Sequence, residues 1–114
     1  TLDVLRYGAG HHAGSYYPGE GGTIIIAAHN DWGMFYNLPK VKVGDIVTIK
    51  TVYGTYNYKV DRTEIANAKV LGENLKIRTD LEEIMLYTCY PVGTPGFKSN
   101  RFVVYGRLVG EENE

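Results

Sequence analysis

The sequence has 114 residues, enough for one domain with a single hydrophobic core. Hydrophobic residues make up 44% of it and charged residues 22%, an ordinary globular balance. The formal net charge of −1 leaves no basic surface for nucleic acid or for an anionic membrane. The single cysteine excludes an internal disulfide and a zinc site of paired cysteines. No apolar run approaches the roughly 20 residues that a membrane span needs.

Fourteen glycines and ten tyrosines, with many Val, Ile and Thr, favour strands joined by turns over long helices. We therefore expect an all-β or mainly β fold. The expected strands cover 2–7, 23–29, 46–53, 56–62, 84–89 and 101–109, with 46–53 and 56–62 forming a hairpin about Gly54-Thr55. The expected connections are a helical turn at 34–38, a long segment with one short element at 65–81, and a frayed acidic tail at 110–114.

The glycine-rich segment from Gly8 to Ser15 superficially resembles a nucleotide-binding loop. Its third glycine falls one place late, however, and no helical pattern follows, so we do not expect a nucleotide site. His11 and His12 are adjacent, so their side chains point apart on an extended backbone and are poorly placed to share a metal.

Cys89 lies at the end of a predicted strand, two residues before Pro91. A lone cysteine is more often a small buried hydrophobic residue. A strand end, however, can hold a nucleophile rigidly and leave it open to a substrate. The next strand begins at Arg101, and antiparallel pairing of these sequence neighbours would place Arg101 beside Cys89. Side-chain alternation puts both residues on one side of the sheet.

His29 ends the strand 23–29 and would join them if that strand ran parallel to the Cys89 strand and beside it. An imidazole can favour the reactive thiolate, and a guanidinium supplies directed donors for an oxyanion. Taken singly, His29 could be a polar strand cap and Arg101 a surface charge. Together the three residues indicate a site for acyl transfer.

At these positions the chain resembles the sortases of Gram-positive bacteria. Four pieces occur in the family's order: the loop at 10–22, Ile26-Ala27-Ala28-His29, Met85-Leu86-Tyr87-Thr88-Cys89 and Arg101-Phe102-Val103-Val104. The third is similar to the signature T-L-x-T-C, with Met85 in place of the first threonine, a change that should affect packing rather than chemistry. The resemblance runs from about Gly8 to Val109. Cys89-Tyr90-Pro91, the short length and the absence of an insertion after residue 60 are most like class D.

The resemblance implies a closed β-barrel of about eight strands with short helical turns. It implies one catalytic domain over residues 1–114 that lacks its native amino-terminal anchor and first elements, and that acts at the extracellular face of the membrane. The implied activity is transpeptidation of surface proteins that carry an LPXTG-like sorting signal, without a cofactor. We find no clear acidic cluster for the calcium that some relatives need. The acceptor would be an amine of a cell-wall precursor or a pilin.

In that scheme Cys89 forms a thioester with the signal, His29 acts as general acid and then as base, and Arg101 stabilises the oxyanion. Thr88 would line the groove. The segment 65–81 leads into the Cys89 strand, so its apolar residues should pocket the signal's leucine and proline: Val70, Leu71, Leu75 and Ile77.

Two other functions stay open. One is a non-catalytic β-barrel binding module in which Cys89 is a core residue. The other is a plain cysteine hydrolase, because water can also resolve a thioester. The papain arrangement is disfavoured, since there the cysteine precedes its histidine in the chain.

Overall fold

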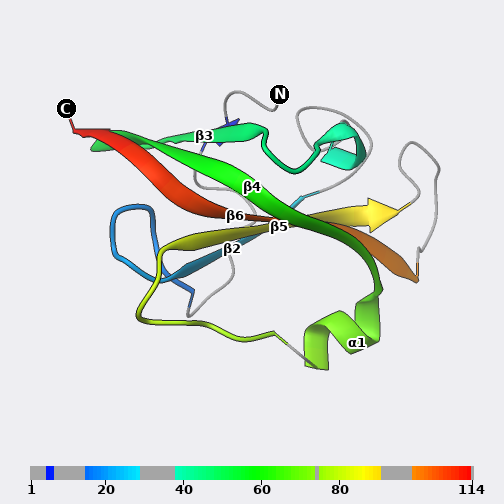
Figure 1. Cartoon of the computed structure of the whole chain (residues 1–114). Coiled ribbons are helices and arrows are strands. Elements are labelled where there is room, and N and C mark those ends of the chain that lie inside the picture. The colour runs from blue at the N-terminus through cyan, green and yellow to red at the C-terminus, as the bar shows by residue number, and fades with distance from the viewer. Residues whose placement is uncertain (1–4, 7–14, 29–37, 74, 91–98, 114) are drawn as a thin grey trace.

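The computed structural model describes residues 5–6, 15–28, 38–73, 75–90 and 99–113, which form one mixed sheet of six strands (Figure 1). The strand order across the sheet is β1-β3-β4-β6-β5-β2. The elements are β1 (Leu5–Arg6), β2 (Thr23–Ala28), β3 (Ile46–Lys50), β4 (Gly54–Asn67), α1 (Ala68–Glu73), β5 (Glu83–Tyr90) and β6 (Asn100–Asn113). The β1/β3 and β2/β5 pairs are parallel, and the other neighbours are antiparallel.

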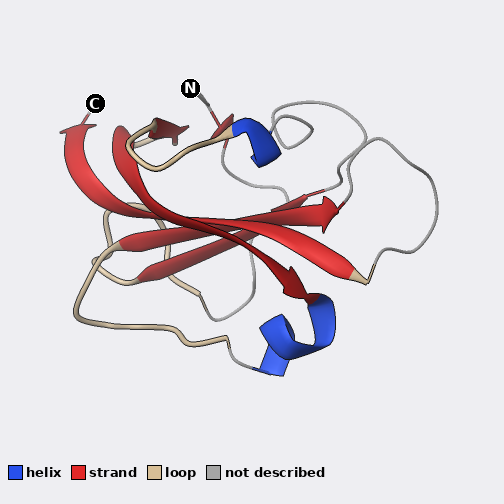
Figure 2. Ribbon diagram, turned by 45° about the vertical axis from the view of Figure 1, so that its right-hand side comes forward, coloured by secondary structure: helices blue, strands red, loops and turns tan. Residues whose placement is uncertain are grey.

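Two long central strands give the sheet its curl (Figure 2). β4 and β6 pair from Gly54↔Asn113 to Asn67↔Asn100, with irregularities at Asn57/Tyr58 and Val60/Arg62. Such irregularities increase the local twist of a strand pair. The mainly β prediction is confirmed. In the described residues, however, the sheet has six strands rather than eight, and no ladder joins its edge strands β1 and β2.

The main hydrophobic core fills one side of the curled sheet. It contains Ile24, Ile26, Leu38, Val41, Val47, Ile49, Tyr56, Tyr58, Val60, Ile84, Leu86, Phe102 and Val104. The other side carries a smaller buried cluster of Ile25, Met85 and Val103, which Leu71 of α1 covers. The apolar run in β2 is therefore buried on both faces, as its lack of alternation predicts.

The predicted hairpin is real, but its turn lies at residues 51–53 rather than at Gly54-Thr55. The reason is the Thr51 side chain. Its hydroxyl oxygen accepts hydrogen bonds from the backbone N–H groups of Tyr53 (3.1 Å) and Gly54 (3.0 Å). This local turn competes with strand pairing and ends β3 at Lys50.

Two further boundaries differ from the predictions. Residues 65–67 belong to β4 rather than to the long connection, and α1 is that connection's short element. Residues 110–113 are not a frayed tail, because β6 continues through them and pairs with Gly54–Asn57. In both places a neighbouring strand distant in sequence supplies the hydrogen-bond partners.

The predicted helical turn at 34–38 lies mostly outside the described residues. A single 3-10 turn covers residues 38–40, and the Val41 N–H donates to the Leu38 carbonyl over 3.0 Å. None of the helical segments that the structure describes is long and apolar enough to cross a bilayer.

Candidate active site

Cys89 and Arg101 are directly opposite each other in the β5–β6 ladder. The antiparallel pairing predicted from their sequence order is therefore confirmed. Cys89 lies near the end of β5, Arg101 lies near the start of β6, and both are partly exposed. The guanidinium of Arg101 donates to the backbone carbonyl of Asn100 over 2.9 Å. The thiol and the arginine thus share one end of the sheet.

β2 runs parallel to β5 and beside it, which is the arrangement that the hypothesis for His29 required. The last pair of this ladder is Ala28↔Thr88, one residue before Cys89. His29 follows Ala28 in the chain and lies outside the described residues.

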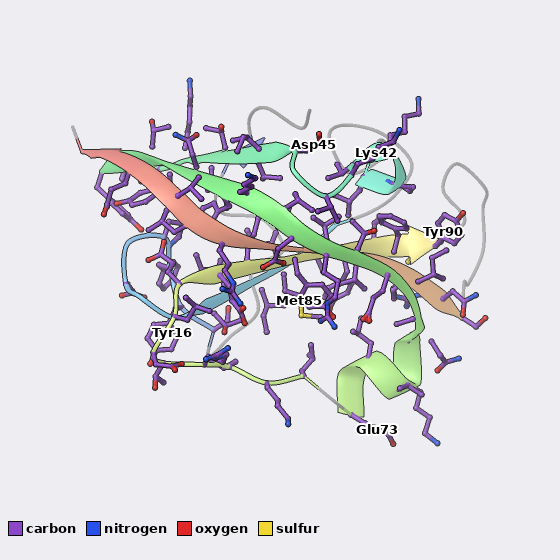
Figure 3. The ribbon with its side chains drawn as sticks, in the orientation of Figure 1. Tyr16, Lys42, Asp45, Glu73, Met85 and Tyr90 are labelled. Atoms are coloured by element: carbon purple, nitrogen blue, oxygen red, sulfur yellow. The ribbon has the colours of Figure 1, made fainter. Side chains whose placement is uncertain are left out.

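The side of the sheet that carries Cys89 is here called the catalytic face. Across β5, β6 and β4 its residues form four rows: Cys89, Arg101 and Ala66; Tyr87, Val103 and Glu64; Met85, Tyr105 and Arg62; and Glu83, Arg107 and Lys59. Successive rows are about 7 Å apart, since two strand residues separate them. Figure 3 shows Met85 pointing from the sheet toward α1, so the helix overhangs this face.

A groove of about 730 Å³ runs along this face, and its lining includes Ala66 of the first row, Glu64 of the second, and residues of the third and fourth rows. Its floor includes Met85 and Tyr105. Its wall includes Val70, Leu71 and Leu75, three of the four apolar residues predicted to bind substrate.

The other predicted binding residues lie elsewhere. Ile77 is 42% exposed and is not among the lining residues of this groove. Thr88 is 1% exposed, on the opposite side of β5 from Cys89. Thr88 and Leu86 share the core side of the strand.

Tyrosine hydroxyls carry much of the polarity of the catalytic face. Burial raises the pKa of Tyr87, the positive charge of Arg101 opposes this shift, and Cys89 adds to it. Burial also raises the pKa of Tyr105, and the Glu64 carboxylate contributes to the increase. Both phenols are therefore neutral hydrogen-bonding groups near pH 7.

The structure reveals a polar cluster on this face that the sequence analysis missed. The Tyr105 hydroxyl donates to Oε1 of Glu64 over 3.4 Å, and the Arg62 guanidinium lies 4.0 Å from the centroid of the Tyr105 ring. The alternation of Arg62, Glu64 and Ala66 along one strand already indicates that these three side chains share a face. Using it required the β4–β6 register, which sequence reasoning did not supply.

The sortase domain family model matches residues 1–109. The chain belongs to the sortase family. It is 33% identical over 107 residues to Sortase D of Bacillus subtilis (strain 168), covering 94% of this chain and 53% of that protein. The chain thus spans about half the length of this curated relative.

Solved sortase structures share the fold. Sortase C1 of GBS Pilus Island 1 aligns with a TM-score of 0.75 and 28% identity, covering 94% of this chain and 57% of that one. Listeria monocytogenes sortase A aligns with a TM-score of 0.74 and 23% identity, covering 97% and 80%. The Clostridium perfringens Sortase D5 transpeptidase aligns with a TM-score of 0.73 and 22% identity, covering 94% and 70%.

Proposed function

We propose that this sortase domain is the catalytic part of a class D transpeptidase. It cleaves an LPXTG-like sorting signal through a thioester on Cys89 and transfers the acyl group to an amine. One observation carries the proposal: Cys89 faces Arg101 across the ladder, at the end of a face that holds a groove, in a chain of this family. The similarity to Sortase D of Bacillus subtilis favours class D.

The proposed chemistry assigns one role to each residue. The sulfur of Cys89 attacks the carbonyl carbon of the signal's threonine, in the Thr–Gly bond or its equivalent, and the resulting oxyanion accepts hydrogen bonds from Arg101. His29 gives a proton to the leaving amine, so that the tetrahedral intermediate collapses to the thioester. His29 then takes a proton from the incoming amine as that amine displaces the sulfur. Parallel pairing of β2 with β5 supports the role of His29, because β2 ends at Ala28 beside Thr88.

The groove is proposed to hold the signal's leucine and proline. Along β5, Met85 is four residues from Cys89, or about 13 Å at the rise of a strand. In an extended peptide the leucine is three residues, about 10 Å, from the carbonyl under attack. The apolar wall of Val70, Leu71 and Leu75 therefore lies within reach of the leucine. Thr88 would contribute from the core side of the strand that bears Cys89, and Ile77 would contact the signal from outside the groove lining.

The remaining features of the proposal concern the whole protein. We propose that its sheet closes into a barrel of about eight strands and that it acts at the outer face of a Gram-positive membrane. Its partners would be surface proteins with a carboxy-terminal signal and an amine of the cell wall or a pilin. Family membership supports the proposed location and partners, and the mainly β sheet described above supports the proposed barrel.

Acyl–enzyme formation tests this function directly. The wild-type protein and Cys89→Ala are incubated with peptides that vary around LPXTG and LPXTA, with and without hydroxylamine or an amine acceptor, and followed by mass spectrometry. We expect wild type to gain the acyl mass at Cys89 and to pass it to the amine faster than to water. Cys89→Ala should form no adduct and unfold at nearly the same temperature.

Each rival function predicts a different outcome. Cleavage that ignores the Leu-Pro positions, or that is indifferent to added amine, would identify a cysteine hydrolase. Absence of acylation by every peptide would favour the binding module. Turnover by Cys89→Ala would rule out the covalent mechanism.

A further inference from the structure

The groove continues past its apolar wall into a charged end. The row farthest from Cys89 holds Glu83 and Arg107 on neighbouring strands, and both line the groove. Lys76 and Arg78 line it from the segment that follows α1. Glu83 is six residues from Cys89, or about 20 Å along β5. The groove is therefore longer than the reach of the signal's leucine.

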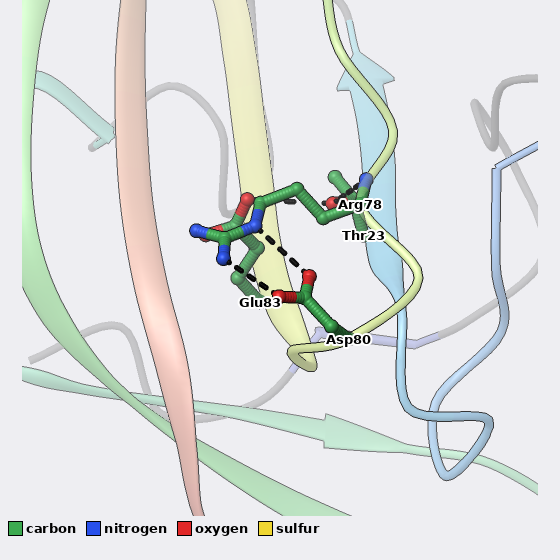
Figure 4. A network of polar contacts seen from close by, with 4 residues as sticks. All are labelled: Thr23, Arg78, Asp80 and Glu83. Atoms are coloured by element: carbon green, nitrogen blue, oxygen red, sulfur yellow. Dashed lines mark hydrogen bonds and ion pairs between the residues drawn. The ribbon is translucent and has the colours of Figure 1, made fainter.

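The carboxylates at this end already have partners. Asp61 pairs with Arg107 over 3.1 Å. Asp80 pairs with Arg78 over 3.0 Å, and Figure 4 shows Glu83 lying alongside this pair. Glu83 also accepts a hydrogen bond from the Thr23 hydroxyl over 3.3 Å. Within this end, the negative charges are thus engaged by cations or donors of the protein itself.

Two lining cations are not paired with a carboxylate. Among the described residues, neither Arg62 nor Lys76 makes an ion pair. The guanidinium of Arg62 lies 4.0 Å from the centroid of the Tyr105 ring, rather than within ion-pair distance of a carboxylate among the described residues. Lys76 is exposed beside Leu75, at the edge of the apolar wall. An incoming carboxylate would gain attraction here without displacing an existing ion pair.

The rise per residue of an extended peptide determines which substrate residue reaches the charged end of the groove. If the leucine occupies the wall near Met85, the residue two positions before it lies about 7 Å farther along an extended peptide. That distance is one row of the catalytic face, from Met85 to Glu83. An acidic side chain at that position would therefore lie in the row next to that of Arg62, where the long side chains of Arg62 and Lys76, which both line the groove, can reach it.

We infer that Arg62 and Lys76 form an additional subsite, which selects substrates with an acidic residue shortly before the sorting signal. This inference rests on the proposed function, because it takes the thioester at Cys89 and the leucine at the apolar wall as given. Exposed ion pairs are weak, so the subsite adjusts the choice among substrates by about two- to fivefold. The effect falls on substrate binding, since the two rows over which the subsite lies are about 13 and 20 Å from Cys89 along β5.

The test compares three peptides that share one LPXTG core and differ only at the second residue before leucine, which is Asp, Asn or Lys. Single-turnover acylation of Cys89 is measured against peptide concentration by mass spectrometry. We expect the half-saturating concentration to be about two- to fivefold lower for Asp than for Asn and highest for Lys, at similar limiting rates. Added salt should reduce these differences.

Substitutions of Lys76 and Arg62 test whether the preference for the Asp peptide arises at this subsite. Lys76→Gln and Arg62→Gln should each weaken the preference for Asp, and together they should remove it. Lys69→Gln, an exposed change on α1 outside the groove lining, should retain it. Equal use of the three peptides, or a preference that persists in the double variant, would overturn the inference and leave the proposed function intact. Failure of all three to acylate Cys89 would overturn the proposed function and, with it, the subsite.

Discussion

Arg101 is opposite Cys89 in the β5–β6 ladder, and the proposed mechanism assigns its guanidinium to the oxyanion. Loss of one oxyanion donor costs roughly 10²–10³ in rate at comparable acyl-transfer sites. We expect Arg101→Ala to reduce the acylation rate by that factor. Arg101→Lys should fall between Ala and wild type, because lysine keeps the charge but loses the planar fork.

Acylation of the same peptide by wild type and variants, measured at saturating concentration, checks this prediction. Lys59→Ala is the matched control, since Lys59 is an exposed cation of β4 that does not line the groove. It should behave like wild type. An Arg101→Ala variant of normal rate would remove Arg101 from the mechanism.

Glu82 is a buried carboxylate that the proposed chemistry does not use. It accepts hydrogen bonds from the backbone N–H groups of Gly19 (3.0 Å) and Gly21 (2.9 Å) and from the Tyr58 hydroxyl (2.6 Å). The carboxylate thereby holds the loop before β2 against the core. This explains how a charged side chain can be only 8% exposed.

Tyr58→Phe should destabilise the protein by about 1.5–3 kcal/mol, because the buried carboxylate loses a hydrogen-bond donor. Tyr53→Phe is the comparison, since the Tyr53 hydroxyl donates to the neutral carbonyl of Pro18 and the side chain is 43% exposed. Its cost should be about 0.5–1.5 kcal/mol. Denaturant unfolding of the two variants measures both, and equal losses would contradict the role given to Glu82.

At the scale of elements, the loop before β2 packs closely against the segment that leads into β5. A Cβ atom added at Gly22 would lie 2.5 Å from ring atoms of Tyr16 and 2.8 Å from the backbone oxygen of Arg78. The Thr23 N–H also donates to that oxygen over 3.0 Å, so neither backbone can move apart freely. Position 22 therefore requires glycine, because the Tyr16 ring and the Arg78 backbone lie too close for any Cβ atom.

Gly22→Ala should cost about 1–3 kcal/mol, as overpacking does in well-packed sites. Gly72→Ala is the control, because a Cβ at this position in α1 meets no atom within 4 Å. Alanine there should be neutral or stabilise the helix by up to about 1 kcal/mol. Thermal unfolding of the two variants checks the contrast, and a stable Gly22→Ala would show that the loop can shift.

For the whole molecule, tyrosine burial sets a limit on stability at alkaline pH. Burial raises the pKa of Tyr53, Tyr56, Tyr58, Tyr87 and Tyr105 above the ordinary value of 10.0. For Tyr58 the shift is large, and its hydrogen bond to Glu82 adds to it. The folded state therefore favours the neutral phenols, and the unfolded state releases their protons at lower pH.

The resulting stability is fully present below about pH 10, the unfolded value, and is lost as the pH rises above it. We expect the unfolding temperature to decrease between pH 9 and 11. The decrease should be shallower in Tyr58→Phe than in wild type. An unfolding temperature independent of pH over this interval would contradict the burial of these phenols.

Much of the site could be predicted because it depends on local pattern and chain order. Strand alternation, with pairing of sequence neighbours, correctly placed Cys89 opposite Arg101. Of the four apolar residues of 65–81 predicted to bind the signal, Val70, Leu71 and Leu75 line the groove and Ile77 does not; their binding of substrate stays a prediction. Whether Ile77 lines the groove depends on how the chain turns after α1, which its apolar character alone does not encode.

The strand content, the order of His29, Cys89 and Arg101, and the family resemblance are properties of residue type and spacing, so they can be read from the chain alone. The parallel neighbour of β5, the length of β6, and the row that brings Arg62 to Tyr105 depend on contacts between distant segments, which the folded structure reveals. Strand pairing is a contact between distant segments, and its hydrogen bonds carry no side-chain signature. A polar acidic tail can thus end in a strand, since β4 supplies the backbone partners that its composition does not predict.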